Sequence, residues 1–206
     1  MNLAVCFKGY PDLHSLIYHY IAHMKKKYPL LLLFCYLVSE VTFAQPVVPS
    51  AADILQNAYK QANLENKNVF VIFHASWCVW CHKMDSSMND KACKELFTNN
   101  YVTCHLTVDE SKDKKNLENP GAVELRKKYH GEDAGLPFWL IFDRKGKLLA
   151  DSRIRPEGAG IDKTGESIGC PASKEEVTYF IKLLRSTSRI TIPQSKLIEE
   201  RFSRNK

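Results

Sequence analysis

The chain has 206 residues, of which 45% are hydrophobic and 25% charged. This is the composition of an ordinary globular protein and excludes a disordered tail, while 9 glycines and 9 prolines exclude collagenous and low-complexity classes. The formal net charge of +6 is spread along the chain, so we expect no nucleic-acid partner. Seven cysteines are too few for a disulfide-scaffold miniprotein. A globular domain remains in which a few cysteines carry chemistry.

Residues 24–44 have the pattern of a secretory signal peptide. Met24 begins a basic stretch, an apolar run extends from Tyr28 to Val38, and Ala44 has the small side chain that signal peptidase prefers. The apolar run is about half of the ~20 residues needed to span a bilayer, which disfavours a permanent transmembrane helix. We therefore expect cleavage after Ala44 and a periplasmic or secreted protein. An uncleaved anchor and a buried helix are the alternatives.

Cleavage at this site would divide the chain into a leader, residues 1–44, and a mature part of the size of one domain with a helical tail, residues 45–206. Residues 1–23 carry no recognisable signal, and Met24 is an alternative start of the protein. The mature part keeps an odd number of cysteines: Cys78, Cys81, Cys93, Cys104 and Cys170. An odd number in an exported protein argues for at least one free or reactive thiol.

The first half of the mature chain is predicted to alternate helix and strand. Capping residues and hydrophobic periodicity predict a helix over 50–66, a strand over 69–73, helical turns over 78–97 and a strand over 101–108. The helix starts with a capping box at Ser50. The strand 69–73 is apolar without alternation, which is typical of a strand covered on both faces. The following run, 109–118, is charged and is predicted to be solvated.

The second half is predicted to close the sheet with a hairpin. Its predicted elements are a helix over 119–131, a strand over 138–142, a strand over 147–152, a loop over 154–171, a helix from 173 to 185, and an amphipathic tail over 194–202 that packs back or extends freely. Two strands joined through a helix imply a parallel crossover, and the hairpin adds an antiparallel pair. We predict an α/β fold, a mixed central sheet with helices on both faces.

The strongest functional motif is Cys78-Val79-Trp80-Cys81, directly after a predicted buried strand. A cysteine at a helix N-terminus faces unpaired backbone N–H groups and the positive end of the helix dipole, which favours its thiolate. Two cysteines three residues apart on a first helical turn can close a disulfide with little backbone movement. We therefore expect Cys78 to attack a substrate disulfide and Cys81 to resolve the mixed disulfide.

Three other interpretations of the cysteine pair stay open. Together with His82 the pair matches c-type haem attachment, although a site between a buried strand and a helix suits that poorly. A structural zinc site would need two further ligands, and Cys93, Cys104, His105 and Cys170 show no regular spacing. The third interpretation is an inert structural disulfide. Redox chemistry without an organic cofactor or a metal is the one we prefer.

Two segments carry a resemblance to a known family. One extends from Val69 to Met84, with a buried strand, then Ala-Ser-Trp, then Cys-x-x-Cys. The other is Gly-Leu-Pro-Phe at 135–138, followed by an apolar strand and Asp143-x-x-Gly146. In this order they resemble the thioredoxin superfamily, over roughly Ser50 to Arg185 and closest to its secreted or periplasmic members. The Cys-Val-x-Cys pattern is also similar to the C-terminal domain of the periplasmic transmembrane disulfide reductase.

The resemblance implies a thioredoxin fold and thiol–disulfide oxidoreductase activity. It implies that Pro137 follows a cis peptide bond and faces the cysteine pair, and that Leu136 offers its backbone to an extended substrate. Trp77 and Trp80 are predicted to form an apolar rim for a polypeptide, or else to be packing aromatics. The substrate-binding candidates are therefore Trp77, Leu136 and Pro137.

The sequence also departs from thioredoxin, which has Gly-Pro between its cysteines and a buried aspartate in the preceding strand. The position of that aspartate is Ile72 here, and the position of the lysine that pairs with it is His105. We hypothesise that His105 handles part of the proton transfer near Cys81; a histidine merely lying on a sheet face is the alternative. His74 and His82 flank the motif and either tune the thiolate or are bystanders.

The other cysteines are predicted to be structural or reactive according to their surroundings. Cys93 and Cys104 are predicted to be buried small hydrophobes, with a bridge between them as the alternative. Cys170, in a glycine-containing loop, is predicted to be more exposed and to be the odd reactive thiol.

These patterns together predict a monomeric thiol–disulfide oxidoreductase outside the cytoplasm. Its partners would be protein disulfides or thiols, with a membrane electron donor or acceptor. A rival of another class is a non-catalytic binding module in which the Cys78–Cys81 disulfide is a structural staple. A third hypothesis is metal handling through the two cysteines and a histidine.

Overall fold

The computed structural model describes residues 17–20, 22–23 and 47–205. The chain divides into two units, Met1–Val47 and Val48–Lys206, each described by itself. In the first unit residues 17–20 and 22–23 are helical and exposed. The predicted signal peptide, 24–44, lies outside the described residues. Within the described parts of the chain, no helix is long and apolar enough to cross a membrane.

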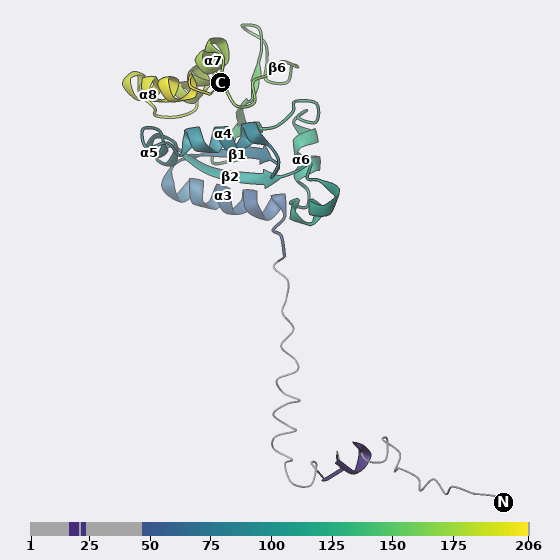
Figure 1. Cartoon of the computed structure of the whole chain (residues 1–206). Coiled ribbons are helices and arrows are strands. Elements are labelled where there is room, and N and C mark those ends of the chain that lie inside the picture. The colour runs from purple at the N-terminus through teal and green to yellow at the C-terminus, as the bar shows by residue number, and fades with distance from the viewer. Residues whose placement is uncertain (1–16, 21, 24–46, 206) are drawn as a thin grey trace, which may run out of the picture. The chain divides into compact units, whose positions relative to one another are not determined.

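The second unit alternates helices and strands as predicted, labelled here as in Figure 1. In chain order the elements are α3 (Ala51–Glu65), β1 (Asn68–His74), α4 (Val79–Met88), α5 (Lys94–Thr98), β2 (Tyr101–Thr107), the 3₁₀ helix η1 (Lys112–Leu117), α6 (Ala122–Lys128), β3 (Phe138–Phe142), β4 (Leu148–Asp151), β5 (Arg153–Ile154), β6 (Glu166–Ser167), α7 (Lys174–Ser186) and α8 (Ile192–Phe202).

The central sheet is mixed and has the strand order β2-β1-β3-β4. β1 and β2 are parallel and are connected through α4 and α5, whereas β3 pairs antiparallel with both β1 and β4. Because β1 and β2 are parallel, their C-terminal ends lie at the same edge of the sheet. The predicted α/β fold with a mixed sheet is confirmed.

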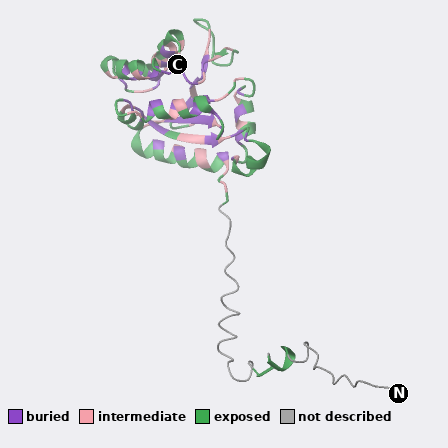
Figure 2. Cartoon of the chain, viewed as in Figure 1, coloured by how far each residue is buried: buried purple, intermediate pink, exposed green. Residues whose placement is uncertain are grey.

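Helices cover both faces of the sheet, and the alternation of side chains along β1 explains why (Figure 2). Phe70 and Ile72 point to the core shared with α4, α7 and α8. Val69, Val71 and Phe73 point to the opposite core, shared with α3 and α6. All five are at most 1% exposed, and burying such a side chain contributes roughly 1.5–3 kcal/mol. This is why the strand is apolar without a period of two.

Capping residues fix the predicted helix starts. The Ser50 side chain accepts a hydrogen bond from the Asp53 N–H at the start of α3. Ser173 and Glu176 form a capping box at the start of α7. The predicted tail is α8, and it packs back onto the domain, since Ile198 and Phe202 are fully buried in the core.

The structure departs from the prediction at three places. Most of the run 109–118 is exposed as predicted, including η1, but Glu110 is only 4% exposed. The helix predicted over 119–131 begins later, as α6 with Gly121 at its N-cap, because the Asn119 side chain accepts from the Thr107 N–H and donates to the Pro49 carbonyl instead. The predicted loop 154–171 contains β6, which forms a short antiparallel ribbon with β5.

Candidate active site

The cysteine pair lies where β1 ends and α4 begins. Residues 75–78, which we call the active-site turn, are closed by a 3.1 Å hydrogen bond from the Cys78 N–H to the Ala75 carbonyl. Cys78 itself is the N-cap of α4, with extended backbone angles. A buried strand, a tight turn and a helix start thus place the first cysteine at the positive end of a ten-residue helix.

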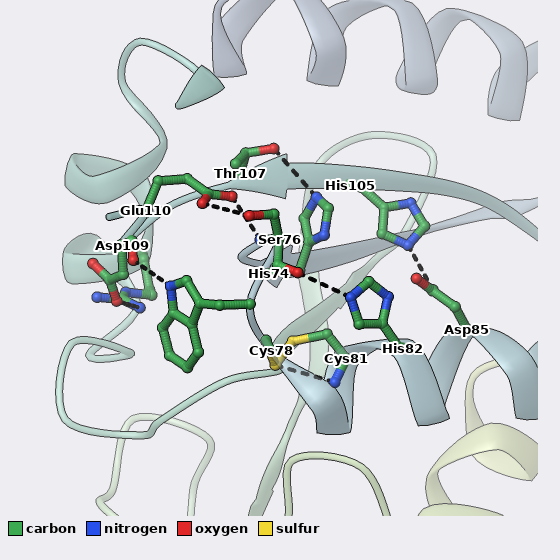
Figure 3. Close-up of a disulfide and its surroundings, with 12 residues drawn as sticks. His74, Ser76, Cys78, Cys81, His82, Asp85, His105, Thr107, Asp109 and Glu110 are labelled. Atoms are coloured by element: carbon green, nitrogen blue, oxygen red, sulfur yellow. Dashed lines mark hydrogen bonds and ion pairs between the residues drawn. A yellow bond between two sulfur atoms is a disulfide. The ribbon is translucent and has the colours of Figure 1, made fainter. Parts of the chain in front are cut away.

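Cys78 and Cys81 are joined by a disulfide, with 5.2 Å between their Cα atoms. The Cys81 N–H donates to the Cys78 Sγ at 3.1 Å (Figure 3). A hydrogen bond of this kind stabilises the thiolate when the disulfide is reduced. The two residues are only 3% and 2% exposed, so the surface that they offer to a reaction partner, which we call the opening, is small.

Large apolar side chains surround that opening. Trp77, Val79 and Trp80 are 58%, 64% and 42% exposed, respectively. The Lys83 ammonium lies 4.1 Å from the centroid of the Trp80 ring, a cation–π contact. Both tryptophans are therefore surface residues rather than core residues.

The opposite side of the site is formed by the loop before β3. The Leu136–Pro137 peptide bond is cis, as the resemblance implied. Leu136 packs against Ala75, Cys78 and Cys81. The loop before α7 lies beside β3, because the Trp139 Nε1 of β3 donates a hydrogen bond to the carbonyl of Gly169 in that loop at 2.8 Å. A groove between these segments is lined by Trp80, Leu136, Gly169 and Cys170, among others.

The three candidate histidines have separate partners. The His82 Nε2 lies 3.0 Å from the Ser76 carbonyl oxygen, and the His74 Nε2 lies 3.2 Å from the Thr107 hydroxyl. The His74 and His105 rings are 5.2 Å apart. Burial lowers the pKa of His74, and the neighbouring His105 lowers it further.

His105 is paired with a carboxylate that the sequence hypothesis did not include. Its Nε2 is 2.8 Å from the Asp85 Oδ1, and both side chains are about one-third exposed. Asp85 is one helical turn after Cys81 on α4, so their Cβ atoms are roughly 5–6 Å apart. Ile72 is the β1 residue in register with His105, so the buried aspartate position is apolar.

Asp109 and Glu110, which we call the 109–110 loop, were missed as site residues. The Trp77 Nε1 donates to the Asp109 carbonyl at 2.8 Å. The Ser76 N–H and hydroxyl donate to the two carboxylate oxygens of Glu110, at 2.6 and 2.8 Å (Figure 3). Their position in the sequence could have identified them, because these acidic residues closely follow β2, the strand that is parallel to β1 before the cysteines.

The remaining described cysteines are free. Burial raises the pKa of Cys93 to about 11 and the pKa of Cys104 to about 12. They belong to opposite faces of the sheet, so the alternative of a bridge between them is wrong. Cys170 is buried rather than exposed, and burial raises its pKa to about 12, so the prediction that it is the reactive thiol is also wrong.

In the described part of the chain no group of three or more His, Cys, Asp or Glu is arranged to hold a metal ion.

A strand-to-helix Cys-x-x-Cys disulfide beside a cis proline, in a mixed four-stranded sheet, is the arrangement of a thioredoxin-like fold. Residues 51–144 match the family model described as Thioredoxin-like. This part of the chain, from α3 to the end of β3, is a thioredoxin-like domain, which is a fold of thiol–disulfide oxidoreductases.

Solved structures that match the chain are distant in sequence. A disulphide isomerase from Xylella fastidiosa Temecula1 is 19% identical, with 54% of this chain and 79% of that chain covered and a TM-score of 0.42. A thioredoxin from Thermus thermophilus is 18% identical, with 66% and 82% covered and a TM-score of 0.39. A thioredoxin-fold protein from Helicobacter pylori is 14% identical, with 66% and 82% covered and a TM-score of 0.36. No curated protein matches the chain.

Proposed function

We propose that this protein is a thiol–disulfide oxidoreductase that exchanges the Cys78–Cys81 dithiol and disulfide with protein substrates outside the cytoplasm. The observation that carries the proposal is the position of Cys78 at the N-cap of α4, with the Cys81 N–H directed at its sulfur. Both features stabilise a thiolate, which is the nucleophile in disulfide exchange.

In the reducing direction the Cys78 thiolate attacks one sulfur of a substrate disulfide. A mixed disulfide forms and the other substrate sulfur leaves as a thiolate. Cys81 then loses its proton and attacks the Cys78 sulfur, which releases the second substrate sulfur and closes the disulfide. The oxidising direction is the reverse of these steps. A membrane electron donor or acceptor would return the pair to its starting state.

The surface around the opening supports a polypeptide substrate. Trp77 and Trp80 offer exposed apolar area on one side, and Leu136 with Pro137 offers a backbone edge on the other. An extended segment lying between them would bring a cysteine to the buried sulfurs. The three histidines are proposed to tune the reactivity of the cysteine pair. His82 would act through the Ser76 carbonyl and His105 through the Asp85 carboxylate. His74 would act through its contact with His105.

A disulfide exchange assay tests the proposal. The wild-type protein should reduce a disulfide-bonded protein in the presence of dithiothreitol, with turnover abolished in Cys78→Ser. Cys81→Ala should accumulate mixed disulfides through Cys78, because the resolving thiol is missing. Cys93→Ser is a matched control, since that thiol lies in the core away from the opening.

One observation favours the rival function of a binding module with a structural disulfide. Cys78 and Cys81 are nearly as buried as core residues, which is also expected of an inert staple. If wild type and Cys78→Ser are equally inactive and Cys81→Ala traps no partner, the binding module replaces the enzyme.

The proposed compartment rests on the sequence of residues 24–44. Expression of the full chain in a bacterium, followed by fractionation and N-terminal sequencing, should give a processed protein that begins at Gln45. An unprocessed chain in the soluble fraction of the cytoplasm contradicts the export proposal and leaves the exchange chemistry untouched.

A further inference from the structure

The active-site turn is held in place by the 109–110 loop. Ser76 and Trp77, the two central residues of the turn, both donate hydrogen bonds to this loop. The Ser76 carbonyl is in turn contacted by His82 from α4. The turn that delivers Cys78 to its helix is thus fixed by a segment 34 residues away in sequence from Ser76.

Glu110 is the charged member of this arrangement. Glu110 is only 4% exposed, and its carboxylate accepts two hydrogen bonds from Ser76. Burial alone would raise the pKa of Glu110, but the Ser76 hydrogen bonds, with Lys114 and His74 nearby, bring it below its usual value. The Glu110 N–H donates to the Glu118 carboxylate at 2.7 Å, which fixes the loop itself.

The charge of Glu110 is close enough to affect the cysteine pair. A Glu110 oxygen lies 2.6 Å from the Ser76 nitrogen, and two residues of even fully extended chain span about 7 Å. The carboxylate is therefore within roughly 10 Å of the Cys78 backbone. At that separation, with an effective dielectric constant between that of bulk water and that of a protein surface, two unit charges interact by enough to shift a thiol pKa by about 0.3 to 1 unit.

We propose that Glu110 is a positioning residue for the Cys78–Cys81 couple, which fixes the active-site turn through Ser76 and, as a permanent negative charge, favours the disulfide over the dithiol. In the reduced protein the Cys78 sulfur carries a negative charge, whereas the disulfide is neutral. A second negative charge nearby disfavours only the reduced state, so the couple is more reducing than it would be without Glu110. This inference rests on the proposed function for its biological meaning.

The couple is measured against glutathione, where two glutathione thiols reduce the Cys78–Cys81 disulfide and one glutathione disulfide is released. Glu110→Gln keeps an oxygen to accept from the Ser76 N–H and gains an amide that can donate to the Ser76 hydroxyl. It therefore removes the charge and retains the anchoring. We expect the equilibrium to move toward the dithiol by about 2- to 10-fold, and the midpoint pH of Cys78 alkylation to fall by about 0.3 to 1 unit.

Two variants of η1 complete the experiment. Asp113→Asn removes the same charge from an exposed neighbour that makes no hydrogen bond to the turn, and it should leave both measurements near wild type. Lys114→Gln removes an exposed positive charge whose Nζ lies 3.4 Å from the Ser76 hydroxyl. It should shift both measurements weakly in the direction opposite to Glu110→Gln, and it provides a test even if Glu110→Gln does not fold.

The proposal is overturned if Glu110→Gln changes only the thermal stability, or if Asp113→Asn moves the equilibrium as much as Glu110→Gln does. It is also overturned if Glu110→Gln does not fold and Lys114→Gln leaves the equilibrium unchanged. The glutathione titration reports the couple whether or not the protein turns over a substrate. An inactive wild type with a responsive titration would therefore contradict the proposed function alone.

Discussion

The described thiols should differ in reactivity by orders of magnitude once the disulfide is reduced. Burial raises the pKa of Cys93 to about 11 and those of Cys104 and Cys170 to about 12. At pH 7 such thiols are thiolate in only about one part in 10⁴ to 10⁵. The thiolate, not the thiol, is the species that reacts with an alkylating agent.

Cys78 should behave in the opposite way, because it is the N-cap of α4 and accepts a hydrogen bond from the Cys81 N–H. Cysteines in such positions have a pKa of about 3.5–7.5. With a pKa at the top of this range, about a quarter of the Cys78 sulfur is thiolate at pH 7. The expected thiolate fraction therefore exceeds that of the buried cysteines by at least about 10³-fold.

The assay is alkylation of the reduced protein with iodoacetamide between pH 4 and pH 10 (roughly the range that separates these thiols), with each peptide quantified by mass spectrometry. Cys78 should react first, with a sigmoidal dependence on pH whose midpoint is below the ordinary cysteine value of about 8.5. A midpoint at or above that value would refute the reasoning. So would alkylation of Cys170 at a rate similar to that of Cys78.

Four further predictions concern stability and proton transfer. Phe202→Ala should lower the free energy of unfolding by about 3–5 kcal/mol, measured by urea denaturation, because the ring is fully buried against α5 and α7. Asp151→Ala should cost about 3–5 kcal/mol in the same assay, since it removes a buried carboxylate and leaves the largely buried Arg155 side chain, bonded to it at 2.6 and 2.7 Å, without a carboxylate partner. Because burial lowers the pKa of His74 from 6.5, stability should fall as the pH drops below that value, and His74→Gln should reduce the slope. His105→Ala should change the pH profile of mixed-disulfide resolution, and an unchanged profile excludes a role for His105 in proton handling.

The fold could be predicted from sequence wherever a local pattern has one physical solution. The apolar run in β1 needs cover on both faces, and the Ser50 and Ser173 side chains satisfy helix N–H groups that nothing else reaches. The cysteine pair follows for the same reason, since three-residue spacing at a helix start brings two sulfurs into bonding range. These features depend on neighbours in the chain.

The errors concern residues whose environment is set by distant segments. Glu110 lies in a charged run that is typical of a solvated loop, but it is buried, and its carboxylate is bonded to Ser76, which follows the neighbouring strand. Cys170 lies in a glycine-containing loop and was predicted to be exposed. It is buried, and the Asn205 side chain after α8 reaches both its sulfur and the Pro171 carbonyl. No local pattern encodes either contact.

Contacts with segments that are distant in the sequence also support the active site. The thioredoxin-like match ends at residue 144, but the active-site helix is also held from beyond it, because Asn205 accepts a hydrogen bond from Ser87 of α4 at 2.9 Å. Arg201 pairs with Asp90 just after α4. The cysteines are therefore positioned from two sides: the 109–110 loop holds the turn before α4, and α8 with Asn205 holds its far end. A shift at either end of α4 would move Cys78, its N-cap, relative to the amides that stabilise the Cys78 sulfur. The chemistry of the Cys78–Cys81 pair therefore depends on packing over most of the domain.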